Sequence, residues 1–418
     1  MKREIIRNFL LPSVLLLASV HRLSAADNSA ADNSAADNSV IDSMEALPRV
    51  AGEKVTAELV DGKLGRAVKL RFDDGCQNVY AQTRSRGASE WNTSDGFSFW
   101  VKGDGSGHLG GVEFVWNDDY ALRYAFAFPI NHTDWRKIVV RWRDLTPETA
   151  NPAALPIDPQ HGNAPSKLGA IGFGKWWYWR DYAAHSYTID DIRLETSLPD
   201  NDEDLRPVDL RPAGKPLARV KQKIARKEPV KIVLMGDSLT DVRHWANREQ
   251  NWPAMLEAKL NAAGVKPTLV NTAIGGTELR QNIVLIPRWS EEHRDADLVI
   301  TCFGGNDWSS GMRGPLFEQT CVTAIEAIRR ATRGGADVLL CTTCPSAERW
   351  DTMAELCAAC RAAAKSQHAG LADIDAAFHA AGKTVAERNG LFVSDKTHLA
   401  PAGHRLFAET VFSILALP

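Results

Sequence analysis

Residues 230–418 alternate between short apolar runs and longer stretches of helical periodicity, and this alternation restricts the fold more than any other feature. The apolar runs include KIVLMG, TLVNTA, DLVITCFG, ADVLLCTTC and LADI, and helix-like stretches such as NWPAMLEAKLNAAG and GPLFEQTCVTAIEAIRRATRGG separate them. Strand and helix in repeated alternation predict a parallel sheet covered by helices on both faces. We therefore expect a three-layer α/β domain over residues 230–418.

The ends of the first three apolar runs carry candidate catalytic groups. The first run ends in Gly236-Asp237-Ser238, the second in Gly275-Gly276, and the third in GGND, which contains Asn306. In an open parallel sheet these ends meet at one edge, where ligands bind. Ester hydrolysis needs a nucleophile and N–H donors for the oxyanion. We predict Ser238 as the nucleophile, with the N–H groups of Ser238 and Gly276 and the Asn306 amide as donors; strand register alone does not separate Gly275 from Gly276.

A serine nucleophile needs a base, and the segment SDKTHLAPAGH supplies one. Asp395 and His398 lie three residues apart, so the carboxylate can accept from Nδ1 while Nε2 faces Ser238. His404 is a competing base without an acid at matching spacing. His244, on the loop after Ser238, would also lack an orienting carboxylate.

The four blocks GDSLT, NTAIGGTE, GGND and DKTH, in this order and spacing, resemble the signature of the SGNH (GDSL-type) hydrolase superfamily across residues 230–418. The resemblance implies a flavodoxin-like α/β fold and carboxylic ester hydrolysis through an acyl-enzyme on Ser238. The sequence lacks G-x-S-x-G around Ser238, so the α/β-hydrolase elbow is not expected. Trp308, Trp245 and Arg280 are candidates for the pocket wall, or alternatively framework residues.

Residues 40–197 have a different composition, with many short alternating runs punctuated by turn residues. This pattern predicts an all-β sandwich. The segments DSMEA, GFSFWVKGDGSG and YTIDDIRLE resemble galactose-binding-type jelly rolls, such as family 11 carbohydrate-binding modules. The resemblance implies a possible structural calcium with Glu45, Asp190 and Asp191 as candidate oxygen ligands; alternatively these acids are solvated or make turn bonds.

Four histidines of this region, His108, His132, His161 and His185, are not spaced as metal ligands. The run GKWWYWRD at 174–181 is more informative. In a strand, Trp177 and Trp179 would share one face and Trp176 and Tyr178 the other. One pair would fill the core, and the other would form either a platform for sugar rings or a domain interface.

The N-terminus indicates export. Lys2, Arg3 and Arg7 precede the apolar run FLLPSVLLLASV, and small residues follow it, as in a secretory signal over residues 1–25; an uncleaved anchor is the alternative. A repeated AADNS segment over 26–39 is expected to be a tether, and 198–229 a linker that is helical near LARVKQKIA. The formal net charge of −3 argues against bulk attraction to nucleic acid, and no other segment is expected to enter a membrane.

The segments CTTC at 341–344 and CAAC at 357–360 have the spacing of a zinc ribbon. Because the first lies in a predicted core strand and the second in a predicted helix, we expect no zinc there. A disulfide between strand and helix is the expectation for an oxidising compartment.

Together these features predict a secreted or periplasmic serine esterase that needs no cofactor for catalysis and acts on an acylated carbohydrate, with O-acetyl as the expected acyl group. A lipid-directed esterase or thioesterase is one alternative. A non-catalytic glycan-binding protein is the other, against which the complete catalytic set argues.

Overall fold

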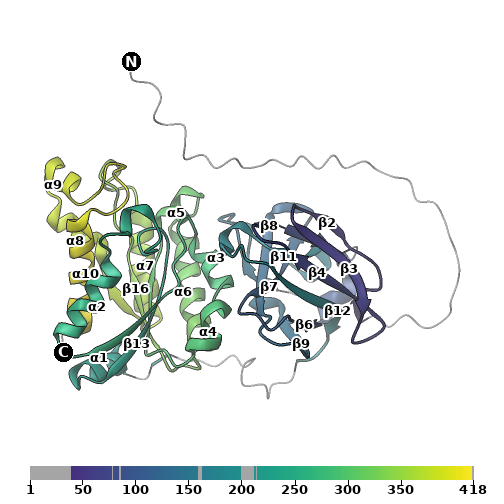
Figure 1. Ribbon diagram of the computed structural model, residues 1–418. Helices are drawn as coiled ribbons and strands as arrows, with labels where there is room; N and C mark the ends of the chain where they lie inside the picture. Colours follow the sequence, from purple (N-terminus) through teal and green to yellow (C-terminus); the bar gives the residue numbers. More distant parts are fainter. Residues whose placement is uncertain are drawn as a thin grey trace, which may run out of the picture. The chain divides into compact units, whose positions relative to one another are not determined.

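The computed structural model describes residues 39–77, 79–83, 86–158, 162–198, 211–212 and 214–416 (Figure 1). The predicted signal, the tether before Ser39, most of the first half of the linker and His161 lie outside the described residues. From Ser39 onward the described residues form one compact unit. None of the helices among them is both long and apolar enough to cross a membrane.

The N-terminal half folds as two antiparallel sheets, which confirms the predicted jelly-roll sandwich. The first sheet runs β3 (Val55–Asp61), β4 (Arg66–Phe72), β12 (His185–Glu195), β6 (Gly96–Lys102) and β9 (Trp135–Arg141), with β1 (Val40–Asp42) also paired to β12. The second runs β10 (Thr146–Pro147), β8 (Asp119–Pro129), β7 (Leu109–Trp116), β11 (Leu168–Lys175), β5 (Val79–Gln82) and β2 (Arg49–Ala51).

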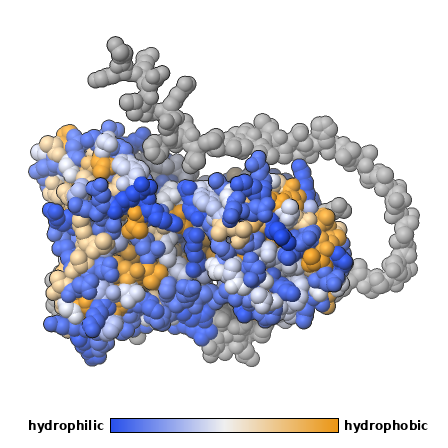
Figure 2. Space-filling view, viewed as in Figure 1, coloured by the Kyte–Doolittle hydropathy of each residue, from blue (hydrophilic) through white to orange (hydrophobic). Residues whose placement is uncertain are grey.

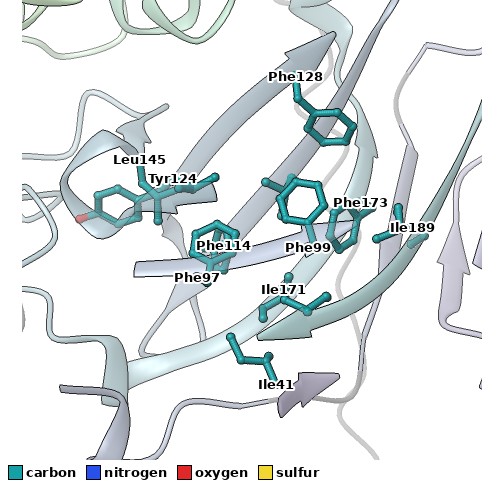
Figure 3. Close-up of a cluster of buried hydrophobic side chains, with 14 of the residues drawn as sticks. Ile41, Phe97, Phe99, Phe114, Tyr124, Phe128, Leu145, Ile171, Phe173 and Ile189 are labelled. Carbon is teal, nitrogen blue, oxygen red and sulfur yellow. The ribbon is translucent and has the colours of Figure 1, made fainter. Parts of the chain in front are cut away.

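Aromatic side chains from alternate positions fill the space between these sheets. Phe97 and Phe99 of β6 lie two residues apart and so point to the same face. The Phe97 ring lies 4.9 Å from that of Phe114, and the Phe99 ring lies 5.2 Å from Phe128 and 5.4 Å from Phe173, all centroid to centroid (Figure 3). The period-two pattern of the sequence thus produces the core directly.

The C-terminal half contains a parallel sheet in the order β14 (Lys266–Asn271), β13 (Pro229–Gly236), β15 (Leu298–Cys302), β16 (Asp337–Cys341) and β17 (Gly370–Ala372). Numbered along the domain this order is 2-1-3-4-5, which confirms the flavodoxin-like prediction. The helices are α1 (Ala218–Ala225), α2 (Trp252–Ala262), α3 (Leu279–Val284), α4 (Pro287–His293), α5 (Gly305–Ser309), α6 (Gly314–Ala331), α7 (Ala354–Ser366), α8 (Ile374–Ala381), α9 (Val385–Gly390) and α10 (Pro401–Ala416).

Strand β13 is apolar from Ile232 to Met235 because both of its faces are covered there. Ile232 and Leu234 belong to the core shared with α1, α2, α8 and α10, whereas Val233 and Met235 belong to the core shared with α3, α4, α6 and α7. A strand buried on both faces reads as a continuous apolar run. On the visible face of the molecule, apolar and hydrophilic side chains are interspersed (Figure 2).

The tryptophan-rich run is not a strand, contrary to prediction. β11 ends at Lys175, and Trp177–Trp179 form a 3-10 turn, η4. Trp179 is therefore buried at 2% exposure while Trp177 is 37% exposed, so the two do not share a face. Trp176, Tyr178 and Trp179 instead belong to an apolar cluster with Leu109, Ala125 and Ala127 of the sandwich and Ile274, Val284 and Leu285 of the α/β half.

The predicted disulfide is also wrong, since all seven cysteines are free and buried. Cys341 ends β16, and its carbonyl oxygen accepts a hydrogen bond from the Cys360 thiol of α7 at 3.7 Å. The Cys357 thiol likewise donates to the Thr343 carbonyl oxygen at 3.6 Å. Burial raises the pKa of the Cys341 and Cys357 thiols, which keeps them protonated. The absence of zinc stays a prediction.

Candidate active site

The turn after β13 presents Ser238 at the edge of the sheet. Asp237 closes this turn, because its Oδ1 accepts from the Leu239 N–H at 2.9 Å and its carbonyl oxygen accepts from the Thr240 N–H at 3.0 Å. A side chain at position 236 would not be accommodated, since its Cβ would lie 2.5 Å from Thr240 Oγ1. Gly236 is thus required for the close approach of Thr240.

Asn247, which the sequence did not single out, holds the same turn from the following loop. Its buried Nδ2 donates to the Ser238 carbonyl oxygen at 2.6 Å and to the Asp241 carbonyl oxygen at 2.8 Å. These bonds fix the carbonyl group of the nucleophile and the backbone three residues after it. Orientation of a reacting group by its surroundings lowers the barrier by ordering it in advance.

Ser238, His398 and Asp395 form a continuous chain of hydrogen bonds. Ser238 Oγ lies 2.9 Å from His398 Nε2, and His398 Nδ1 lies 2.7 Å from Asp395 Oδ2. The second carboxylate oxygen, Asp395 Oδ1, accepts from the N–H groups of Thr397 and His398 at 2.9 Å each. Partial burial alone would raise the pKa of Asp395, but the bonds from His398 and Thr397 outweigh it and lower that pKa. The carboxylate is thus held ionised beside the imidazole.

The two glycines of the NTAIGGTE segment, Gly275 and Gly276, differ in whether their N–H group is available to an oxyanion. The Gly275 N–H donates to Asp241 Oδ2 at 3.0 Å, so this amide is already occupied. Gly276 has a φ of +81°, which only glycine adopts readily, and this conformation turns the chain at the strand end. The geometry favours Gly276 over Gly275 as an oxyanion donor.

Asn306 lies on α5, immediately after β15, and its side chain is oriented by a neighbouring backbone. Its Nδ2 donates to the Thr277 carbonyl oxygen at 3.0 Å and lies 3.5 Å from Asp237 Oδ2. Ser238 and Asn306 both line one cavity of about 330 Å³, together with Trp308, Thr343 and Asp395. The nucleophile, the amide and the acid predicted from separate blocks therefore converge on one cavity.

Three carboxyl groups with raised pKa values lie near these donors. Burial raises the pKa of Asp237 to about 7 and that of Asp307 to about 6, and burial together with the charge of Asp307 raises the pKa of Glu278 to about 7. Asp307 Oδ1 accepts from the Leu279 N–H at 3.0 Å, which ties α5 to the start of α3. These raised pKa values reduce the negative charge that the three carboxyl groups place near a developing oxyanion at neutral pH.

The two competing histidines serve other purposes. His404 Nδ1 accepts from the Trp252 N–H at 3.2 Å at the start of α2, and burial lowers the pKa of His404 to about 4. The His244 ring stacks on the His398 ring at 4.1 Å between centroids. Burial and the neighbouring His398 lower the pKa of His244 to about 4. His244 therefore packs on the His398 imidazole, whose Nε2 is the nitrogen that faces Ser238.

The predicted pocket residues divide into two groups. Trp308 lines the cavity, and Trp245 is 50% exposed with its ring 6.0 Å from that of His398, so both remain candidates for substrate contact, as does Trp177. Arg280 is only 4% exposed, donates to the Thr149 carbonyl oxygen and lines a different cavity, so its placement in the ester pocket is wrong. Trp179 is too deeply buried to stack on a sugar, so that prediction is also wrong.

Two groups of residues in the sandwich bear on metal binding. Contrary to prediction, His108 and His185 lie together with Asp181, with ligand atoms within 4.8 Å of one another. Burial and the cation of Lys175 both lower the pKa of His185, to about 4. The same ammonium group opposes a bound metal ion, so this group fits a metal poorly.

Two of the three predicted calcium ligands lie at the same loop. Glu45 Oε1 accepts from the Arg66 N–H and Asp190 Oδ2 accepts from the Leu64 N–H, so both carboxylates contact the loop between β3 and β4. Asp190 Oδ1 is buried without a partner, as a ligand oxygen would be. Asp191 is instead paired with Arg193, at 2.7 Å between Oδ2 and Nε, and is not available. Calcium binding at Glu45 and Asp190 stays a prediction.

A Ser-His-Asp hydrogen-bonded chain at the carboxyl edge of a flavodoxin-like sheet is an arrangement that serine hydrolases use. Residues 234–406 match the model of the GDSL-like lipase/acylhydrolase family, so the C-terminal part of the chain is a GDSL-like acylhydrolase domain. The match supports a carboxylic ester hydrolase.

Solved structures resemble one half of the chain or both. The crystal structure of the protein YXIM from Bacillus subtilis spans both halves: it is 14% identical over 88% of this chain and 89% of its own, with a TM-score of 0.38. The following structures resemble one half each. The crystal structure of TesA is 23% identical and covers 44% of this chain and 97% of its own, with a TM-score of 0.38. A variant of Axe2, an acetyl xylan esterase from Geobacillus stearothermophilus, is 20% identical over 44% of this chain and 94% of its own, with a TM-score of 0.37. A family 11 carbohydrate-binding module from Clostridium thermocellum is 14% identical over 38% of this chain and 96% of its own, with a TM-score of 0.30. The comparison with curated proteins gave no match.

Proposed function

We propose that this protein is an exported serine esterase that removes small acyl groups, O-acetyl in particular, from a carbohydrate. The observation that carries the proposal is the hydrogen-bonded chain of Ser238, His398 and Asp395, with 2.9 Å between Oγ and Nε2 and 2.7 Å between Nδ1 and Oδ2. Its place in a GDSL-like acylhydrolase domain supports the same chemistry.

The proposed mechanism has two steps. His398 Nε2 takes the proton of Ser238 Oγ, which attacks the ester carbonyl carbon, while Asp395 holds the imidazole and stabilises its positive charge. The N–H groups of Ser238 and Gly276 and the Asn306 amide stabilise the oxyanion. His398 then protonates the leaving alcohol. In the second step it activates a water molecule that cleaves the acyl-enzyme and releases the acid and free Ser238.

The dimensions and lining of the cavity favour a small acyl group. Its volume of about 330 Å³ is at the lower end for ligand pockets, and polar groups from Asn306, Ser309, Thr343 and Ser346 line it. A long acyl chain would require an extended apolar wall. A lipid-directed esterase is therefore the less favoured alternative.

Carbohydrate as the leaving group is supported by the aromatic side chains near the site. Trp177, Tyr182 and Trp245 are exposed, and Trp308 lines the cavity. Aromatic faces stack on the apolar faces of sugar rings. The signal-like N-terminus and the preceding jelly roll agree with an exported enzyme that meets a polysaccharide.

Hydrolysis of p-nitrophenyl esters from acetate to long-chain acyl groups, together with acetate release from acetylated polysaccharides, tests this proposal. We expect kcat/KM to be highest for acetate and to fall steeply with chain length, and acetate to be released from at least one glycan. Ser413→Ala, an exposed serine of α10, is the matched control for Ser238→Ala. Preference for long chains, or activity that survives in Ser238→Ala, would contradict the proposal.

A further inference from the structure

We propose that Arg180, which the β-sandwich brings to the active site, selects acetylated glycans that carry carboxylate groups, as uronic-acid polysaccharides do. This inference rests on the esterase function proposed above and adds the class of glycan. Three observations carry it: the anchoring of the loop that bears Arg180, the contacts of the guanidinium group, and the cations that line the active-site cavity.

Arg180 belongs to a loop, residues 176–182, that is held on both sides. On the α/β side, Arg288 Nη2 donates to the Trp179 carbonyl oxygen at 2.8 Å, and Trp176, Tyr178 and Trp179 pack on the cluster with Ile274, Val284 and Leu285. On the sandwich side, Asp181 Oδ2 lies 2.6 Å from His108 Nδ1. The loop therefore presents Arg180 from a fixed position, as a specificity-determining residue requires.

The Arg180 side chain lies beside Gly275 and Gly276. Its Nη2 is 3.5 Å from the Gly275 carbonyl oxygen, and a Cβ at position 276 would lie 3.8 Å from the same nitrogen. A Cβ at position 275 would in turn lie 3.6 Å from Ser238 Cβ. Arg180 itself has a φ of +50°, an unfavourable conformation for a residue with a side chain, which the surrounding packing must maintain.

The Arg180 guanidinium has no acidic partner in the described part of the chain. Its contacts are neutral: the Gly275 carbonyl oxygen, the Tyr182 hydroxyl at 3.4 Å and the Trp177 ring at 5.7 Å from its centroid. The nearby Arg243, by contrast, is already paired with both oxygens of Asp241, at 2.8 and 3.0 Å. A guanidinium presents five N–H donors in a planar fork that matches a carboxylate, so Arg180, unlike Arg243, is free to bind one.

Two further cations line the cavity that contains Ser238. Arg349 and Lys396 line the active-site cavity, and within the described ranges neither pairs with an acid. Glu348 is the opposing charge among the lining residues, in addition to the buried Asp237 and the Asp395 of the hydrogen-bonded chain. A polymer with regularly spaced carboxylates would meet these cations as well as Arg180, with Trp177 and Tyr182 available to stack on its sugar rings.

The test uses the full chain and acetylated polygalacturonate in two forms, with free carboxylates and with methyl-esterified carboxylates. We expect wild type to favour the free form in kcat/KM by roughly tenfold, the effect of one charge-assisted contact, and salt to weaken this preference. Arg180→Gln should abolish the preference, with a larger loss of kcat/KM on the free form than on the methyl-esterified form or on p-nitrophenyl acetate. Arg180→Lys should retain part of it, and Arg71→Gln, an exposed arginine of β4, should retain all of it.

The outcomes separate this inference from the esterase function. If wild type hydrolyses p-nitrophenyl acetate but does not distinguish the two glycans, or if Arg180→Gln keeps the preference with an unchanged thermal midpoint, the selection by Arg180 is overturned and the esterase stands. An equal loss on p-nitrophenyl acetate and both glycans would also overturn it, because Arg180 would then act on the oxyanion. Lack of activity of the wild type on every ester would refute the esterase function itself.

Discussion

At the scale of single residues, hydrogen bonds separate His398 from the other histidines of the segment. His404 lies six residues beyond His398 in the sequence, but its Nδ1 is used by the Trp252 N–H at the start of α2. Its depressed pKa, about 4 against 6.5 unperturbed, means that the folded state holds it neutral. His404 is thus a structural acceptor, and its contribution to stability depends on pH.

We predict that His404→Asn makes folding stability less sensitive to acid. The wild-type contribution is fully present above pH 6.5 and is lost as the pH falls toward 4, because the unfolded chain binds the proton first; the loss is about 3 kcal/mol. Asparagine keeps an acceptor near the place of Nδ1 without titrating. Denaturant unfolding at pH 7 and pH 4.5 measures the effect, and an unchanged difference between wild type and variant would argue against it.

Asn306 should act mainly in the transition state. Its Nδ2 is already oriented by the Thr277 carbonyl oxygen, so the donor is in place before the oxyanion forms. Asn306→Ala should lower kcat by about 10² to 10³, with little change in KM. Steady-state kinetics on p-nitrophenyl acetate measures this, and a raised KM with an unchanged kcat would assign Asn306 to ground-state binding.

The sequence is sufficient to predict the site residues that directly follow a strand or lie on one short turn. Ser238 and Asn306 follow strands, and Asp395 and His398 lie on one local turn, so order and spacing place them. Arg180 and Asn247 were not predictable in this way. Arg180 reaches Gly275 from 95 residues away in the chain, through the folding of a separate sandwich, and a local pattern carries no signal of that contact.

At the scale of secondary structure, alternation of apolar residues predicted the strands, and failed in the tryptophan-rich run. The alternation argument assumed that β11 continues, but the chain leaves the sheet after Lys175 and turns through η4 to a left-handed Arg180. Four aromatic residues in succession are compatible with either structure. The turn, and not a continued strand, allows Trp176, Tyr178 and Trp179 to pack against Val284 and Leu285, which are distant in the sequence.

The two tryptophans of η4 should therefore respond differently to substitution. Trp179→Ala empties a buried site and should reduce the free energy of unfolding by about 3–5 kcal/mol. Trp177→Ala removes an exposed ring and should change it by less than about 1 kcal/mol, while weakening turnover of glycans relative to p-nitrophenyl acetate. Urea unfolding and kinetics measure both. Equal destabilisation by the two variants would show that η4 is packed differently.

At the scale of the whole molecule, the sandwich and the α/β half share buried contacts. Besides the apolar cluster, Arg280 donates to the Thr149 carbonyl oxygen and Arg288 to the Trp179 carbonyl oxygen. Burial lowers the pKa of Arg280 to about 10, which reflects how far this cation is removed from water. Separation of the halves would expose apolar side chains and leave these donors without their partners.

We accordingly predict that both halves unfold together. A calorimetric scan should show one transition whose calorimetric and van't Hoff enthalpies agree. Trp179→Ala should broaden or split this transition, because it weakens the shared cluster. Two well-separated transitions in wild type would mean that each half is stable alone and that the contacts between them contribute little.

The central claim is that Ser238 forms an acyl-enzyme with His398 as its base. Ser238→Ala should lower kcat by roughly 10³-fold or more, His398→Ala should be nearly as severe, and Asp395→Ala should be milder, because Asp395 orients the base without transferring a proton. The most direct measurement is mass spectrometry of the protein quenched in acid during turnover of an acetyl ester. We predict a mass increase of one acetyl group, located on the peptide that contains Ser238 and absent from Ser238→Ala. Full activity in Ser238→Ala, or an acetyl group on another residue, would contradict this account.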